Sequence, residues 1–125
     1  MIVVTGELRE AILQAERQLI GAIIWSSRIE GEQAMKYCKT VLSPSDFLDH
    51  QYKDPLNTHS RIFTAMIQCP IAHEVFIAQQ LDALNLLRKG DIAHLFLCTS
   101  ENVHFVYDEY ADIVKEYANK RLGIK

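Results

Sequence analysis

Apolar side chains recur at intervals of three and four residues along most of this chain, and this spacing constrains the fold more than any other feature. Side chains at these intervals share one face of an α-helix, whereas a half-buried strand needs strict alternation. In the first segment, residues 7–25, the apolar positions are Leu8, Ile12, Ala15, Leu19, Ala22 and Ile23. The segment is therefore expected to form a long helix, which the polar run Ser26-Ser27-Arg28 then ends.

Short boundary signals divide the rest of the chain into further helices. Ser43-Pro44 and Asp54-Pro55 each place a capping side chain before a proline, the order typical of a helix start. Lys89-Gly90 is typical of a helix end, and Asp91 is expected to cap the helix that follows. Further helices are expected over residues 29–41, briefly from 44, from 55 to shortly before Pro70, and over 74–87, 92–98 and about 102 onward.

The composition suits one folded domain. The chain has 125 residues, of which 49% are hydrophobic and 23% are charged, so it is far from the composition of a disordered segment. A chain of this length buries roughly two thirds of its unfolded surface, which is enough for one core without metal or disulfide support. We predict an all-α, compact bundle of about six or seven helices in a single domain over residues 1–125.

Charge and cysteine content limit the partners and the compartment. The net charge of −3 argues against a surface made to grip nucleic-acid phosphates, which needs clustered Lys and Arg. The three cysteines form no Cys-x-x-Cys pair, as expected of a reduced intracellular protein. Neither a signal peptide nor a membrane span is recognisable. We expect a cytoplasmic protein with little or no direct nucleic-acid binding and no membrane association.

No catalytic, cofactor-binding or metal-binding motif stands out. The five glycines include no Walker A loop, so the chain alone is not expected to hydrolyse a nucleotide. No two histidines lie three or four residues apart, the spacing that places two metal ligands on one helix face. Acid pairs at 108/112 and 112/116 are open to two interpretations, a cation or acid–base site and a salt-bridged surface, of which the second is favoured. We therefore predict no catalysis and no cofactor.

Aromatic residues near the end of the chain favour a binding function. Tyr107, Tyr110 and Tyr117 share helical spacing, and tyrosine is common at protein interfaces because its ring is apolar and its hydroxyl stays hydrogen-bonded. The same rings are equally suited to closing the domain core. Among the broad classes, a protein-binding module is the best match.

Five stretches stand in a fixed order along the chain: residues 15–24 (AERQLIGAII), 42–47 (LSPSDF), 59–66 (HSRIFTAM), Leu81 with 90–95 (GDIAHL), and 110–122 (YADIVKEYANKRL). Together they resemble the N-terminal domain of the bacterial replicative DNA helicase, the DnaB family. The resemblance covers nearly the whole chain. It implies a helical domain that forms the collar of a ring by self-association, as a dimer or ring collar, and that offers a docking surface to primase and helicase loader.

The resemblance also implies where the chain stands in such a helicase. The ATPase motor belongs to a separate domain of that family, and residue 125 lies in the first part of a helical hairpin that makes dimer contacts. The residues expected to bind a partner are Tyr110, Ile113, Val114, Tyr117 and Arg121, on the last helix. Two alternatives stay open: a free-standing phage or mobile-element adaptor or inhibitor that mimics the collar, and the helicase-binding tail of a primase.

Overall fold

Residues 6–48, 58–69, 71–101 and 106–122 are described by the computed structural model, and in this part of the chain every regular element is helical. A 3₁₀ turn, η1, accompanies the α-helices. The bounds are α1 Gly6–Glu30, α2 Gln33–Val41, η1 Pro44–Asp46, α4 Thr58–Met66, α5 Glu74–Ala83, α6 Asp91–Glu101 and α7 Tyr107–Leu122. The predicted all-α bundle is confirmed. The expected helix start at Asp54-Pro55 lies outside the described residues.

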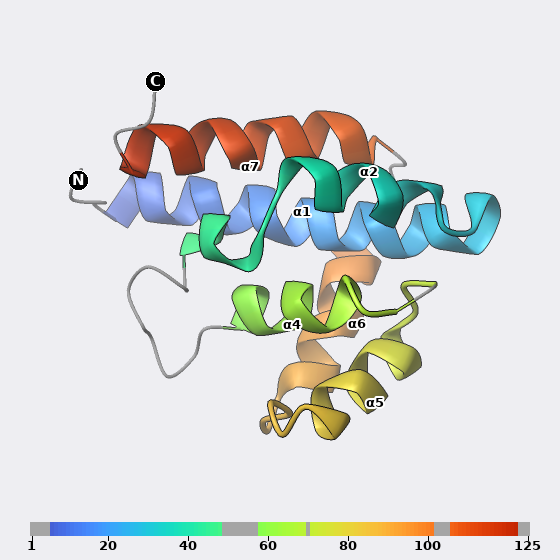
Figure 1. Ribbon diagram of the computed structural model, residues 1–125. Helices are drawn as coiled ribbons and strands as arrows, with labels where there is room; N and C mark the ends of the chain where they lie inside the picture. Colours follow the sequence, from blue (N-terminus) through green and yellow to red (C-terminus); the bar gives the residue numbers. More distant parts are fainter. Residues whose placement is uncertain (1–5, 49–57, 70, 102–105, 123–125) are drawn as a thin grey trace.

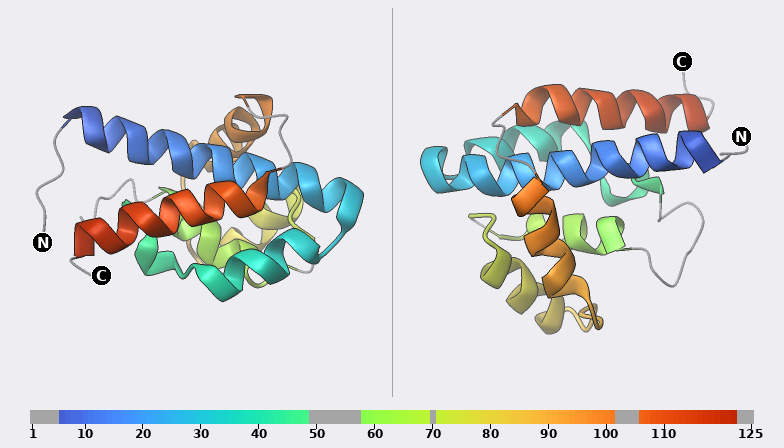
Figure 2. Two further views of the ribbon diagram at one scale, coloured as in Figure 1. Left: turned by 90° about the horizontal axis from the view of Figure 1, so that it is seen from above. Right: turned by 180° about the vertical axis from the view of Figure 1, so that it is seen from behind.

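The helices form two layers (Figure 1). Helices α1, α2 and α7 lie side by side, and we call them the long-helix layer. Helices α4, α5 and α6 lie on the opposite face of α1, and we call them the short-helix layer. Helix α7 runs alongside α1, and α6 crosses α1 at a steep angle (Figure 2). Helix α1 therefore belongs to both interfaces, because it packs against α7 on one side and α6 on the other.

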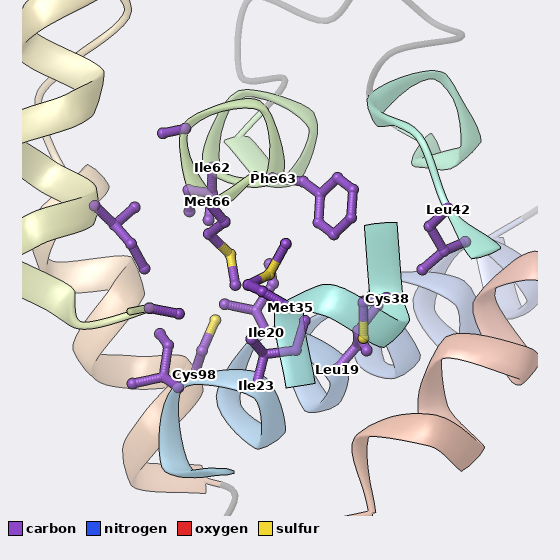
Figure 3. Packing of buried hydrophobic residues seen from close by; sticks show 14 of the residues in the cluster. Leu19, Ile20, Ile23, Met35, Cys38, Leu42, Ile62, Phe63, Met66 and Cys98 are labelled. Atoms are coloured by element: carbon purple, nitrogen blue, oxygen red, sulfur yellow. The ribbon is translucent and has the colours of Figure 1, made fainter. Parts of the chain in front are cut away.

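The core lies between the layers and is filled from every described helix. Ile20 and Ile23 of α1 face Met35 of α2 and Met66 of α4 (Figure 3). All four side chains are between 0% and 3% exposed. Burying an aliphatic side chain of this size is worth roughly 1.5 to 3 kcal/mol. This burial is the main force that holds the two layers together.

Helix α1 continues through the serine pair that was expected to end it. The prediction of a break at Ser26-Ser27-Arg28 is wrong, because the helix runs to Glu30 and both serines are buried. Long-range contacts hold the extra turn: the Trp25 indole Nε1 donates to the Thr99 carbonyl at 2.7 Å. Gly31, with φ of +69°, then supplies the left-handed residue that commonly follows a helix. As a result, α2 begins at Gln33 instead of residue 29.

Helix α5 ends four residues earlier than the predicted boundary at Leu87. Asn85 takes a left-handed conformation with φ of +58°, and its N–H donates to the Asp82 carbonyl. The Leu86 N–H donates to the Leu81 carbonyl at 2.8 Å. These two bonds form a Schellman motif, which ends a helix with asparagine in place of the more common glycine.

The 3₁₀ turn η1 starts as its sequence predicts. Ser43 is the N-cap, Pro44 is the first helical residue, and the Asp46 carboxylate accepts from the Ser43 backbone N–H at 2.8 Å. Asp46 also pairs with Lys115 of α7, with 3.2 Å between Lys115 Nζ and Asp46 Oδ1. The turn is thereby fastened to the last helix.

None of the helices in the described part of the chain combines the length and apolar character needed to cross a bilayer.

Candidate functional site

The five residues predicted to bind a partner lie on α7, but the structure separates them into two groups. Val114 and Arg121 are each 2% exposed, and Arg121 Nη2 donates to the Asp46 backbone carbonyl at 2.7 Å. Tyr110 and Tyr117 are half-buried and pack against the core. Ile113 is 40% exposed. A partner on this helix would thus meet Ile113 and the accessible edges of the two tyrosines.

The surface around Ile113 is mixed, with charged side chains beside apolar ones. A hollow of about 300 Å³ is lined by Ile113, Glu116, Tyr117 and Lys120, and Lys120 Nζ lies 3.3 Å from Glu116 Oε1. Asp112 accepts a hydrogen bond of 3.0 Å from the Tyr37 hydroxyl, and this bond is the main reason that the pKa of Tyr37 is raised. Asp112 is therefore bound to a tyrosine hydroxyl and Glu116 to a lysine.

A second exposed surface lies on α5, α6 and their connection, and it is apolar. Its large side chains are between 38% and 51% exposed: Val75, Phe76, Leu87, Ile92, Phe96 and Leu97. An open groove of about 290 Å³ lies between the helices, lined by Val75, Ala78, Leu87, Ile92 and Phe96, with Glu74, Gln79 and Asp82 at its polar positions. We call the apolar lining of this groove the α5–α6 face. Contiguous exposed apolar surface of this kind marks binding sites.

An ion pair fixes the groove to α1. The Arg28 guanidinium Nη2 donates to both carboxylate oxygens of Glu74 at 2.7 Å. Glu74 is only 3% exposed, so its charge is well shielded from solvent. The same guanidinium lies 4.4 Å from the centre of the Trp25 ring, where a cation–π contact adds to the pairing. The start of α5 is therefore rigidly placed.

A buried ion pair joins α4 to α6. Arg61 donates to Asp91 at 2.5 and 2.9 Å, and both side chains are almost fully buried. Arg61 also donates to the Leu86 carbonyl at 2.8 Å. The sequence predicts Asp91 as a helix cap, but it is the first residue of α6, and its carboxylate accepts from the Arg88 N–H that precedes the helix. The ion pair with Arg61 holds the Asp91 carboxylate in this position.

A chain of buried polar groups runs from α1 through α4 to α6. Glu16 Oε2 accepts from the Leu48 N–H at 2.8 Å, and Glu16 Oε1 lies 2.8 Å from His59 Nδ1. Because a carboxylate offers only acceptors, His59 Nδ1 carries the hydrogen of this bond. His59 Nε2 and His94 Nε2 lie 2.8 Å apart, so one of these two nitrogens donates to the other. Glu16 is 0% and His59 3% exposed.

His94 is the accessible end of this polar chain. Burial, reinforced by His59 and Arg17, lowers the pKa of His94 to about 4, against a smaller opposing effect of Asp91. His94 is therefore neutral at pH 7. Cys98 follows one helical turn later and is fully buried. A ring nitrogen of each histidine and the Cys98 Sγ lie within 4.8 Å of one another.

The sequence interpretation missed both the α5–α6 face and the histidine cluster, although signals for each were present. Residues 92–98 (IAHLFLC) are apolar around almost the whole helix, a pattern that calls for cover on more than one side. His94 and Cys98 are four residues apart, a spacing that places two ligands on one helix face. The sequence interpretation applied this rule to pairs of histidines alone. His59 is distant in sequence, so only the folded structure brings it to this pair.

No family model, curated protein or solved structure matches the chain.

Proposed function

We propose that this chain is a protein-interaction domain similar to the N-terminal domain of DnaB-type replicative DNA helicases, serving ring assembly and docking of primase or helicase loader. The observation that carries the proposal is the α5–α6 face. Several large apolar side chains surround one open groove there, although the chain has a complete core elsewhere. The domain has no catalysis of its own in this account.

Contacts between the stretches that carry the resemblance support the proposal. Glu16, in the first stretch, contacts His59, in the third. Asp46, in the second stretch, pairs with Lys115 in the last, and its backbone carbonyl accepts from Arg121. Stretches that are distant in sequence thus meet through buried and partly buried polar contacts, and such agreement between sequence motifs and packing is a mark of a consistent fold.

We assign the α5–α6 face to a second copy of the chain. A two-fold axis brings the same patch of both copies together, so the patch has to offer both a cavity and protruding groups. The groove supplies the cavity, and Phe96, which lines it and is 49% exposed, supplies a large side chain at its edge. Ile113 and the edges of Tyr110 and Tyr117 on α7 stay available for primase or loader.

Light scattering across a concentration series tests the assignment. The wild-type mass is expected to rise from 14.3 kDa toward twice that value. Phe96→Asp should keep the protein monomeric, because it places a charge in the middle of the shared face. The matched control is Ile113→Asp, which puts the same charge on a residue of α7 that is 40% exposed, against 49% for Phe96, and should leave the dimer intact.

Two results would overturn the assignment. A wild-type chain that stays monomeric at all concentrations rules out self-association through this face. Loss of the dimer in Ile113→Asp but not in Phe96→Asp moves the interface to α7, where the sequence predicts it. Tyr117→Asp is a poorer variant than Ile113→Asp, because Tyr117 packs against the core and its loss perturbs folding as well as binding.

A further inference from the structure

Three side chains with metal-ligand chemistry converge where α4 crosses α6. His94 and Cys98 lie one turn apart on the same face of α6, and His59 comes from α4. A ring nitrogen of each histidine and the Cys98 Sγ lie within 4.8 Å of one another. The two Nε2 atoms of the histidines are 2.8 Å apart. The cluster is separate from the α5–α6 face, since none of its members lines the groove.

The spacing of these atoms is close to that of a zinc site. Zinc binds histidine nitrogen at about 2.0 to 2.1 Å and cysteine sulfur at about 2.3 Å, so tetrahedral ligand atoms stand about 3.3 to 3.6 Å apart. The two histidine nitrogens have to separate by about half an ångström, and the sulfur has to approach by about one. Shifts of this size are within the reach of side-chain rotation.

Glu16 provides an independent feature of a metal site. A histidine that binds zinc usually donates its other ring N–H to a carboxylate, which fixes the tautomer and the direction of the ring. His59 has this arrangement, with Nδ1 directed at Glu16 Oε1 and Nε2 directed at His94. The Glu16 carboxylate is itself held by the Leu48 N–H. With Nδ1 bound to Glu16, Nε2 is therefore the ring nitrogen of His59 that faces the cluster.

We propose that His59, His94 and Cys98 bind one zinc ion, with Glu16 as the outer carboxylate that orients His59. Coordination removes the proton of the Cys98 thiol to solvent, and it displaces the hydrogen between the two histidine Nε2 atoms, which moves to His94 Nδ1 or to solvent. Three protein ligands leave a fourth position for water or another ligand, on the side where His94 is accessible. The ion ties α4 to α6.

Metal titration of the chelator-stripped protein tests the proposal. Zinc chloride, followed by calorimetry, should bind at one ion per chain and raise the melting temperature. Cobalt chloride should give a thiolate-to-metal charge-transfer absorption, which a site without cysteine cannot produce. Cys98→Ser should abolish this absorption and weaken zinc binding at least about ten-fold, and Glu16→Gln should weaken it about ten-fold.

Cys38→Ser is the matched control, because Cys38 is also fully buried in the core but lies outside the cluster. It should keep the cobalt absorption and the zinc affinity of the wild type. If Cys98→Ser does not fold, His94→Asn carries the same test, since His94 is only half-buried, and it should lose at least about ten-fold in affinity. Two results would overturn the proposal: no one-to-one zinc binding by the wild type, or zinc affinity unchanged in the folded cluster variants. The two histidines would then be joined by their hydrogen bond alone, without an ion.

Discussion

The two layers of this molecule bury their apolar surface in different ways, and α7 and α6 show the contrast. Helix α7 places Ala111, Val114 and Ala118 in the core and turns mostly charged side chains outward. Helix α6 buries Leu95 and Cys98, but it also exposes Ile92 and Phe96 on its outer side. An amphipathic helix buries its apolar side against one neighbouring surface, whereas a helix that is apolar on two sides needs a neighbour on each of them. Helix α7 is thus largely covered by its neighbours within the chain, whereas α6 keeps apolar side chains exposed.

Polar contacts follow the same division. The ion pair of Asp46 with Lys115, which fastens η1 to α7, has one partly exposed partner. The Arg61–Asp91 pair of the short-helix layer is almost fully buried, at 5% and 3% side-chain exposure. The Arg61–Asp91 pair is therefore more deeply buried than the pair that fastens η1 to α7. Such pairs are costly to break, because each partner leaves a charge without compensation in the interior.

The largest expected effect is the loss of the buried ion pair in the short-helix layer. Asp91→Ala leaves the Arg61 guanidinium buried without its carboxylate and should lower the free energy of unfolding by about 3 to 5 kcal/mol. Urea denaturation followed by circular dichroism measures it. The double variant Arg61→Met/Asp91→Leu should recover most of the loss, since it removes both charges. A loss below about 1 kcal/mol for Asp91→Ala would contradict the importance of this pair.

A smaller effect is expected in the long-helix layer. Asp46→Ala removes the carboxylate that caps η1 and pairs with Lys115, and it should cost about 1 to 2 kcal/mol in the same assay. Lys115→Met separates the two roles, because it keeps the cap and should cost less than about 1 kcal/mol, as expected of a partly exposed pair. Equal losses in the two variants would show that the cap contributes nothing.

A still smaller stability change is expected on the α5–α6 face. Phe96→Asp should change the free energy of unfolding of the dilute monomer by no more than about 0.5 kcal/mol, because the ring is 49% exposed. The matched core variant is Phe63→Ala, at a residue that is 0% exposed, with an expected loss of about 3 to 5 kcal/mol. A loss for Phe96→Asp comparable to that of Phe63→Ala would place its ring in the core.

The smallest perturbation uses the three thiols as probes of the native fold. Burial raises the pKa of Cys38 to about 12, and Cys98 is 0% exposed, so neither should react with a thiol reagent at pH 8 before the chain unfolds. Half-buried Cys69 should be the one that reacts in the native state, more slowly than a fully exposed thiol because burial raises its pKa. Cys69→Ser should abolish the reaction. Reaction of Cys38 or Cys98 in the native state would contradict the packing described.

Helix identity could be read from the sequence because most helices here carry local signals. Residues 7–25 have helical spacing, and the cap and proline at Ser43-Pro44 start η1 as predicted. The predicted helix ends were less accurate where contacts with residues distant in sequence determine where a helix ends. The contacts of Trp25 with Thr99 and of Arg28 with Glu74 keep α1 helical beyond its serines, and no local pattern contains that information.

The candidate surfaces show the same limit. The spacing of Val114 and Arg121 with Tyr117 marks one side of α7, but it does not say whether that side meets this chain or another. The structure places Val114 and Arg121 inside, while Ile113 stays accessible. Conversely, residues 75–97 give an apolar pattern in which the sequence interpretation recognised two helices but no binding surface. Exposure depends on how many neighbours the fold supplies, which is a property of the complete arrangement.

Hydrogen–deuterium exchange at two protein concentrations tests the central claim, that the short-helix layer carries the interaction surface, most directly. At high concentration, amide exchange should slow in α5 and α6, residues 74–97, and stay unchanged in α7. The same experiment on Phe96→Asp should show no dependence on concentration. Slower exchange confined to residues 107–122, or no change anywhere at high concentration, would contradict the account.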